Sequence, residues 1–202
     1  MSKFMDKIKE TARADKKTIV LAEGEERRTI DAAAQILKEG YANIILLGNE
    51  SKIKSMADGL DISEATIIDP DTSELTEELG NGLYELRKKK GMLPAQAAEK
   101  VKDVLYFGCM LVNTGRADGM VAGAVHATAD VMRSSLQTIK TAPDTKVVSA
   151  FFLMMVPDCE YGNNGTFVFS DCGLNEYPDS EKLAEIAISS SKSYKSLVGG
   201  EP

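Results

Sequence analysis

The amino-acid sequence predicts an α/β protein whose sheet is mostly parallel and carries helices on both faces. One observation is a set of continuous apolar runs, such as residues 44–47 (IILL), which have the composition of strands buried on both sides. A second is that apolar residues recur at helical spacing between these runs, as they do over residues 30–37. Alternating strands and helices joined by crossovers of this length favour parallel pairing.

The first elements are typical of a βαβ unit. Residues 18–22 (TIVLA) form a short β-branched run, which predicts a strand, and the helical pattern over residues 30–37 follows it. Gly40 is a good residue to end that helix, because glycine adopts the left-handed conformation of a helix terminus without strain. The apolar run at 44–47 is then the second strand.

The same alternation continues to residue 140. Basic residues at 87–90 followed by Gly91 are the expected stop signal of a helix, and Pro94 suits the first position of the next one. The elements expected in order are a short helix at 51–57, a strand at 65–68, a long helix that ends at 90, a helix opened by Pro94, a helix at 103–113 that ends before Gly115, a strand at 119–122 and a helix at 129–140.

A domain boundary is expected at Pro143-Asp144, which gives a first domain of residues 1–143 and a second of residues 144–202. The second begins with a long apolar run at 146–156 and continues with a strand at 166–169 and a helix at 179–197. Two strands and one helix are few for an independent sandwich. The second domain is therefore expected to be incomplete.

Composition excludes several classes of function. The chain has 202 residues, 43% hydrophobic and 27% charged, and can bury a sizeable core. Its net charge of -7 argues against a nucleic-acid partner, which normally requires a basic patch. Three widely spaced cysteines outside any CxxC pattern predict neither a disulfide framework nor a zinc site. There is no signal-peptide pattern and no apolar run near the ~20 residues of a membrane span, so a cytoplasmic location is expected.

The most informative segment is residues 118–140 (DGMVAGAVHATADVMRSSLQTIK), where a predicted strand passes through a glycine-containing loop into an amphipathic helix. Free backbone N–H groups and the positive end of the helix dipole make such a place suited to phosphate. Gly123 permits close approach of the backbone, Thr128 is a candidate N-cap with a hydroxyl for an anion, and Arg133 lies in the next turn or so. The segment predicts an anion site.

His126, the only histidine, lies in the same loop. It could donate a hydrogen bond to a phosphoryl or carbonyl oxygen, or act as an acid or base. The alternative is a loop histidine that merely orders its neighbours. Contact with a ligand is favoured over proton transfer.

Arg27 and Arg28 fall at the start of the first predicted helix, where cations oppose the helix dipole. A surface cluster with Glu23, Glu25 or Asp31 would explain both arginines. A bound anion would explain them too, because an arginine fork and a helix N-terminus would then act on the same charge. Arg28 is the better candidate for lining a site.

Arg87 and the three lysines after it form a basic helix end. Such an end is commonly solvated, but near a cleft it could also bind the phosphate groups of an anionic ligand. No GxGxxG follows a strand and no GxxxxGK[ST] occurs, so a nucleotide-binding domain of either kind is disfavoured.

Residues 118–140 resemble the signature of phosphate acetyltransferases, in the phosphate acetyl/butyryl transferase family. The resemblance extends over essentially the whole chain, including IVLAEGEERRTIDAA near the start and FSDCGLNEYPDSEKLAEIAI near the end. It implies a two-domain subunit built as a three-layer α/β/α sandwich of the isocitrate-dehydrogenase-like type. It also implies a homodimer with the active site in the cleft between domains.

The reaction implied by the resemblance is acetyl-CoA plus phosphate giving acetyl phosphate plus coenzyme A, with no permanently bound cofactor and no metal. Such acyl transfer needs positive groups or N–H donors at the carbonyl oxygen and the phosphate, and a base for the thiol. By resemblance, Arg28, Arg87 and Arg133 bind the anions of coenzyme A or phosphate. His126 and Thr128 belong to the phosphate loop.

Two residues depart locally from the family pattern. Ala127 stands where a hydroxyl residue is common, and Ser134 where a proline is usual. Family members are also considerably longer, and their presumed catalytic serine, arginine and aspartate are expected beyond Pro202. The 202 residues alone are therefore expected to be inactive and poorly stable, with apolar surface exposed around residues 147–156.

Two other functions stay open at the level of sequence. One is a phosphate butyryltransferase, which would differ in the size of its acyl pocket. The other is a module that binds coenzyme A or phosphate without catalysis.

Overall fold

The computed structural model describes residues 3–201. Contacts divide the chain into one compact unit of residues 5–140 and a second that consists chiefly of residues 141–201. The expected division into domains after residue 143, with a cleft between them, stays a prediction.

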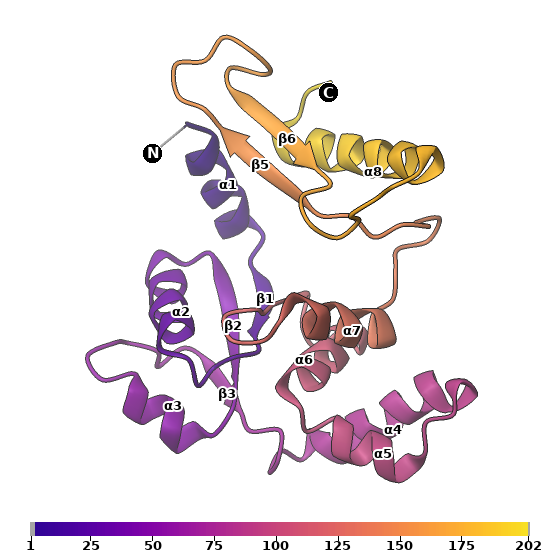
Figure 1. Ribbon diagram of the computed structural model, residues 1–202. Helices are drawn as coiled ribbons and strands as arrows, with labels where there is room; N and C mark the ends of the chain where they lie inside the picture. The colour runs from indigo at the N-terminus through magenta and orange to yellow at the C-terminus, as the bar shows by residue number, and fades with distance from the viewer. Residues whose placement is uncertain (1–2, 202) are drawn as a thin grey trace. The chain divides into compact units, whose positions relative to one another are not determined.

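From β1 to residue 140, strands and helices follow one another in the order that the sequence predicts (Figure 1). The elements are α1 (Lys3–Ala14), β1 (Lys17–Leu21), α2 (Arg27–Glu39), β2 (Ala42–Leu47), α3 (Glu50–Met56), β3 (Thr66–Ile68), α4 (Leu75–Arg87), the 3-10 helix η1 (Lys88–Lys90), α5 (Pro94–Lys100), α6 (Val104–Asn113), β4 (Gly119–Val121) and α7 (Thr128–Thr138).

The four strands form one sheet in the order β3-β2-β1-β4, and every neighbouring pair is parallel. Leu21 at the end of β1 is in register with Leu46 of β2 and Val121 of β4. This confirms the predicted parallel sheet. Because the strands run the same way, their carboxyl ends lie at one edge, where open α/β sheets bind ligands.

Side chains of alternate strand residues bury into two separate cores. Ile44 and Leu46 of β2 belong to a cluster with Ile30 of α2 and Ile53 of α3. Leu47 of β2 belongs to the other cluster, with residues of α4, α5 and α6. Figure 1 shows α2 and α3 on one side of the sheet and α4 to α7 on the other. The predicted arrangement, helices on both faces of a mostly parallel sheet, is confirmed.

Several predicted helix ends are confirmed in detail. Gly40 follows α2 with φ 72°, and its N–H donates to the carbonyls of Ile36 and Leu37. Gly91 follows the basic helix end with φ 84°. Asp103 caps α6 by accepting from the N–H of Leu105 at 2.8 Å.

Helix α1 was not among the predicted elements, because its segment is charged and has no continuous apolar run. Lys9 and Arg13 lie 5.1 and 4.9 Å from the centre of the Tyr41 ring, and both pair with Glu39 at the end of α2. The aliphatic stems of such long cations can cover apolar surface while the charges stay in water. Tertiary contacts therefore support this helix.

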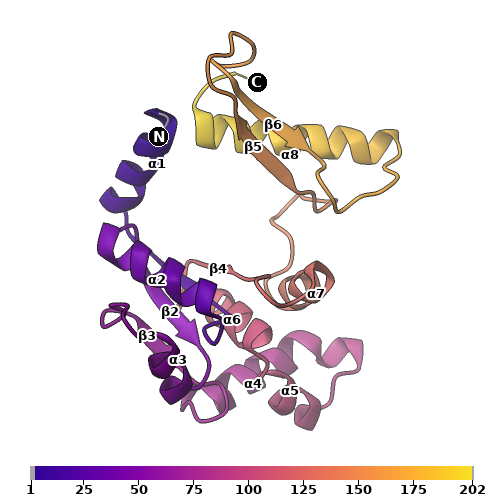
Figure 2. The ribbon, with the colours of Figure 1, turned by 60° about the vertical axis from the view of Figure 1, so that its left-hand side comes forward.

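The second unit contains an antiparallel pair, β5 (Phe151–Met155) and β6 (Thr166–Ser170), and the long helix α8 (Ser180–Val198). Figures 1 and 2 both show α8 alongside the hairpin. Phe152 and Phe169 face each other in register and are 58% and 56% exposed. The expected exposure of apolar surface is confirmed for residues 152 and 154–156, whereas Val147 and Val148 are half-buried.

The expected strand over residues 146–156 is too long. Only residues 151–155 pair, and the turn after β6 binds two of the carbonyls before them. The side-chain amide of Asn175 donates to the Val148 carbonyl at 3.0 Å, and the N–H of Cys172 donates to the Ala150 carbonyl at 3.2 Å. Among residues 3–201, no helix combines the length and apolar character that crossing a membrane requires.

Candidate functional site

The candidate site lies where β1 and β4 end. Leu21 and Val121 are in parallel register, so the residues that follow them, 22–26 and 122–127, leave the sheet side by side. A cavity of about 290 Å³ opens at this edge. It is lined by Ala22, Glu23, Gly24, Glu25, Glu26, Leu47, Lys52, Val104, Val125 and His126.

Glu23 is the central residue of this edge, and only 3% of its side chain is exposed. Its Oε2 accepts hydrogen bonds from the N–H groups of Gly123 and Ala124 at 2.9 and 2.6 Å. Its Oε1 accepts from the N–H groups of Val125 and His126 at 2.9 and 2.8 Å. His126 Nδ1 lies 2.8 Å from the same Oε1. One carboxylate therefore binds an entire loop.

The pKa of Glu23 follows from two opposed influences. Burial favours the neutral acid and would raise the pKa. Hydrogen bonds from the N–H groups of Val125 and His126 outweigh it, together with those from the His126 ring and Ala124, and the pKa is lowered to about 2. Glu23 is therefore ionised near neutral pH, and the loop already holds a negative charge.

The phosphate-loop expectation needs two corrections. The N–H groups of residues 123–126 are not free, because Glu23 accepts hydrogen bonds from all four. Thr128 is the first residue of α7, and Ala127 is the N-cap, with no side-chain capping bond. Gly123 has φ 106°, a conformation that favours glycine. The N–H groups that open α7, at Thr128 and Ala129, and the Thr128 hydroxyl are candidate donors for an anion beside this loop.

Arg28 reaches the same loop from the start of α2. Its Nη2 donates to the Ala124 carbonyl at 2.8 Å and its Nε to Glu26 Oε1 at 2.6 Å, while 70% of the side chain stays exposed. The hydrogen bond with Glu26 raises the pKa of Arg28. Arg27 turns away, to Asp31 and the Met56 carbonyl. Of the two arginines, Arg28 is the one that contacts the loop.

Arg87 and Arg133 lie near a common neighbour, Tyr106 of α6. Burial raises the pKa of Tyr106, and the positive charges of Arg133 and Arg87 act in the opposite direction. Arg133 also pairs with Asp130 at 2.5 Å. Arg87 Nε is buried and has no acceptor among residues 3–201. Lys100 lies 4.4 Å from the centre of the Tyr106 ring, which adds a third cation to this group.

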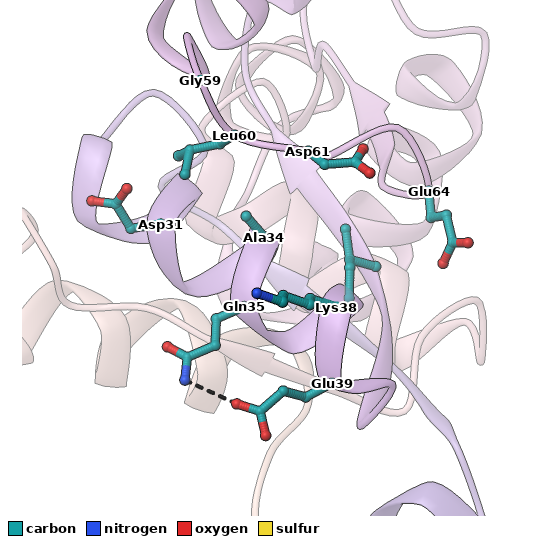
Figure 3. A pocket seen from close by; sticks show the side chains of 10 residues that line it. Asp31, Ala34, Gln35, Lys38, Glu39, Gly59, Leu60, Asp61 and Glu64 are labelled. Atoms are coloured by element: carbon teal, nitrogen blue, oxygen red, sulfur yellow. Dashed lines mark hydrogen bonds between the residues drawn. The ribbon is translucent and has the colours of Figure 1, made fainter.

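A larger cavity, of about 940 Å³, lies elsewhere, between α2 and the segment that follows α3 (Figure 3). Figure 3 shows Asp31 and Glu39 on α2, and Asp61 and Glu64 across from them. Lys38 is the one basic residue among those that line it. An excess of carboxylates repels anionic ligands such as phosphate. This cavity is therefore a poor site for the substrates that the basic residues suggest.

No group of three or more potential metal ligands occurs within residues 3–201. Sequence reasoning treated Glu23 only as a partner for the neighbouring arginines and missed its role at the loop. The available signal was a glutamate placed directly after a buried strand, at the sheet edge where ligands bind. Its loop partners lie about 100 residues away, as the sequence separations of these hydrogen bonds show.

The comparisons with known proteins agree with one another. The family model described as phosphate acetyl/butaryl transferase matches residues 3–202. The chain is 55% identical over 98% of its length to phosphate acetyltransferase of Acetivibrio thermocellus, and 50% identical over 98% to that of Clostridium acetobutylicum. It spans about 60% of the length of each of these relatives.

Solved structures show the same relationship. A phosphotransacetylase from Streptococcus pyogenes superposes with a TM-score of 0.90 at 34% identity, covering 98% of this chain and 60% of that one. EutD phosphotransacetylase from Staphylococcus aureus gives 0.87 at 41% identity, covering 96% and 58%. With a matching family model over nearly every residue, the chain belongs to the phosphate acetyl/butyryl transferase family.

Proposed function

We propose that the protein from which these residues come is an acyltransferase that exchanges an acetyl group between coenzyme A and inorganic phosphate. The observation that carries the proposal is 50–55% identity, over 98% of the chain, to proteins named phosphate acetyltransferase. The 202 residues span about 60% of those relatives, so the activity is proposed for the complete protein.

The two groups of cations provide the anion binding that this reaction needs. Arg28 and the start of α7 are assigned to the phosphate or acetyl phosphate. Arg87 and Arg133 are assigned to phosphate groups of coenzyme A, and the buried Arg87 Nε without an acceptor supports this assignment. Positive groups near the transferred acetyl stabilise charge that develops on its carbonyl oxygen.

His126 and Thr128 complete the proposed site. The imidazole lines the cavity at the sheet edge, and the Thr128 hydroxyl belongs to the first turn of α7. Gly123 provides the backbone conformation that lets the loop turn around Glu23. The proposal includes no resident cofactor and no metal, with acetyl-CoA and phosphate as substrates.

We extend the proposal to assembly, location and the activity of this chain. The exposed apolar side chains of β5 and β6 support a homodimer of the complete protein, because exposed apolar patches mark interaction surfaces. The use of coenzyme A, an intracellular carrier, supports a cytoplasmic location. The 202 residues by themselves are expected to bind ligands without turnover, since about 40% of the relative's length lies outside the match, which covers 60% of it.

The test combines binding with catalysis. Calorimetry should detect coenzyme A binding to the 202-residue chain, and Arg87→Gln should weaken it by about tenfold, the value of one charge-assisted hydrogen bond. The matched control is Lys102→Gln, which removes an exposed cation that pairs with Glu99. Equal affinities for Arg87→Gln and the unaltered chain would remove Arg87 from the proposed site.

Catalysis is measured as acetyl phosphate formation in a coupled assay, with acetyl-CoA and butyryl-CoA compared at equal concentration. Turnover by the complete protein with acetyl-CoA supports the proposal. A higher kcat/KM for butyryl-CoA would reassign the chain to butyryl transfer. Turnover by the 202 residues alone, at the rate of the complete protein, would contradict their proposed inactivity.

A further inference from the structure

We propose that Glu23 is a positioning residue, which orders the 123–126 loop and holds His126 in the tautomer that carries its hydrogen on Nδ1, leaving Nε2 for the ligand. The inference rests on the proposed function, because it assigns Nε2 to an oxygen of phosphate or of the acyl phosphate. It starts from five hydrogen-bonding contacts on one buried side chain.

The first step is the state of the carboxyl group. Backbone N–H groups are donors only, and two of them point at each oxygen of Glu23. A proton on either oxygen would face these donors and cost the loop an acceptor. The lowered pKa of Glu23, about 2, agrees with this geometry. The group therefore acts as an acceptor toward all of its neighbours.

The second step fixes the imidazole. His126 Nδ1 lies 2.8 Å from Oε1, and an acceptor-only oxygen at that distance requires a donor opposite it. Nδ1 must then carry a hydrogen whether the ring is neutral or protonated. The atom that gains or loses a proton is Nε2. A ring without this partner would be free to exchange between both neutral tautomers.

The third step is the chemistry left to Nε2. In the neutral ring it accepts a hydrogen bond from a protonated phosphate oxygen, and in the protonated ring it donates one to an ionised oxygen. The imidazole lines the cavity at the sheet edge, and its side chain is 31% exposed, so a ligand can reach it. A carboxylate behind an imidazole fixes orientation and tautomer in other active sites as well.

Glu23 also determines where an incoming phosphate can be held. The Glu23 carboxylate accepts hydrogen bonds from the N–H groups of residues 123–126, so these groups are not available as donors for an external anion. The phosphate is left with the donors beside this loop, at Thr128 and Ala129, and with Arg28. The internal carboxylate therefore shapes the site without contacting the substrate.

The test uses ¹⁵N signals of the imidazole in the 202-residue chain, which are unambiguous because His126 is the only histidine. In the neutral ring, Nδ1 should show the shift of a protonated nitrogen and Nε2 that of an unprotonated one. A neutral ring protonated on Nε2 would overturn the inference. This measurement needs no substitution, so it stands even if a variant fails to fold.

A pair of variants separates positioning from general electrostatics. Glu23→Gln replaces one acceptor oxygen with an NH₂ group, and the neutral ring should become a mixture of tautomers. Glu25→Gln removes the same charge from the same cavity, but Glu25 pairs with Lys52 and not with the loop, so the tautomer should be unchanged. An unchanged tautomer in Glu23→Gln would contradict positioning by Glu23.

Titration with inorganic phosphate distinguishes this inference from the proposed function. A shift of Nε2 on phosphate addition, with Nδ1 protonated, supports both. No shift at Nε2 or at the Thr128 amide, with Nδ1 protonated, supports positioning but contradicts phosphate binding at this loop. A phosphate response with the hydrogen on Nε2 would retain the function and overturn the role given to Glu23.

Discussion

Glu23 in the first unit and Asp171 in the second both hold a loop by accepting hydrogen bonds from its N–H groups, but over very different distances in sequence. Glu23 binds residues 123–126, about 100 positions away. Asp171 accepts from the N–H groups of Gly173 and Leu174 at 2.9 and 3.0 Å, and from the side chain of Asn175. Each has its pKa lowered to about 2 in spite of burial, which raises it.

The difference shows what each carboxylate contributes to the fold. The turn at Asp171 involves neighbours in sequence and needs little further structure. The Glu23 contacts join the ends of β1 and β4, so they form only after the parallel sheet has assembled. Loss of the Glu23 contacts should therefore affect both the stability of the first unit and the geometry of the candidate site.

The largest effect is expected from removing one acceptor oxygen in each unit. Glu23→Gln should lower the free energy of unfolding by about 3 kcal/mol, because buried N–H groups lose their partner. Asp171→Asn should lower the free energy of unfolding by about 1 kcal/mol. Urea unfolding gives the two values, and amide hydrogen exchange at residues 123–126 and 173–174 locates each effect. Equal losses of unfolding free energy in the two variants would contradict the larger structural contribution assigned to Glu23.

The pH dependence should show the same contrast. The pKa of Glu23 falls from 4.5 to about 2 on folding, so its contribution is complete above pH 4.5 and is lost as the pH falls towards 2. The full contribution is about 3 kcal/mol by linkage. Protection of the amides of residues 123–126, relative to their intrinsic exchange rates, should decrease over that range in the unaltered chain. Glu23→Gln should make amide protection at residues 123–126 nearly independent of pH. An equal loss of protection in both proteins as the pH falls would contradict the assignment of this effect to Glu23.

A smaller effect is expected from deforming the loop while Glu23 is kept. Gly123 has φ 106°, and a Cβ built there meets no atom within 4 Å, so Gly123→Ala should cost backbone strain alone, about 2 kcal/mol. Gly115→Ala is the matched control, with φ 73° and equally open space, and should cost about 1 kcal/mol. Thermal unfolding compares them. Phosphate binding should weaken only in Gly123→Ala.

The smallest effect on stability is expected at Arg28. Its pairing with Glu26 is exposed to solvent, and such pairs contribute little to stability. Arg28→Ala should therefore leave urea unfolding nearly unchanged while it weakens phosphate binding, measured by calorimetry. Arg27→Ala serves as control, since Arg27 faces Met56 rather than the loop. Loss of affinity in Arg27→Ala alone would reverse the choice between these arginines.

Most secondary structure was predictable because its signals act over a few residues. The turn at Gly40 and the stop at Gly91 each depend on neighbours in the chain, and the structure confirms them. Helix α1 was missed because cation contacts with Tyr41 support it from another part of the sequence. The apolar run at 146–156 forms a strand over residues 151–155 only, and the Val148 and Ala150 carbonyls before it accept hydrogen bonds from the turn after β6, which the run itself does not indicate.

The sequence by itself determined the parallel α/β architecture, the family resemblance and the segment at 118–140 that holds His126. Only the tertiary structure decided that the N–H groups of residues 123–126 bind Glu23 instead of an external phosphate. The physical reason is register: pairing of Leu21 with Val121 brings the two chain segments together after β1 and β4. Nothing local to either segment specifies that meeting, because it depends on which strands become neighbours in the sheet.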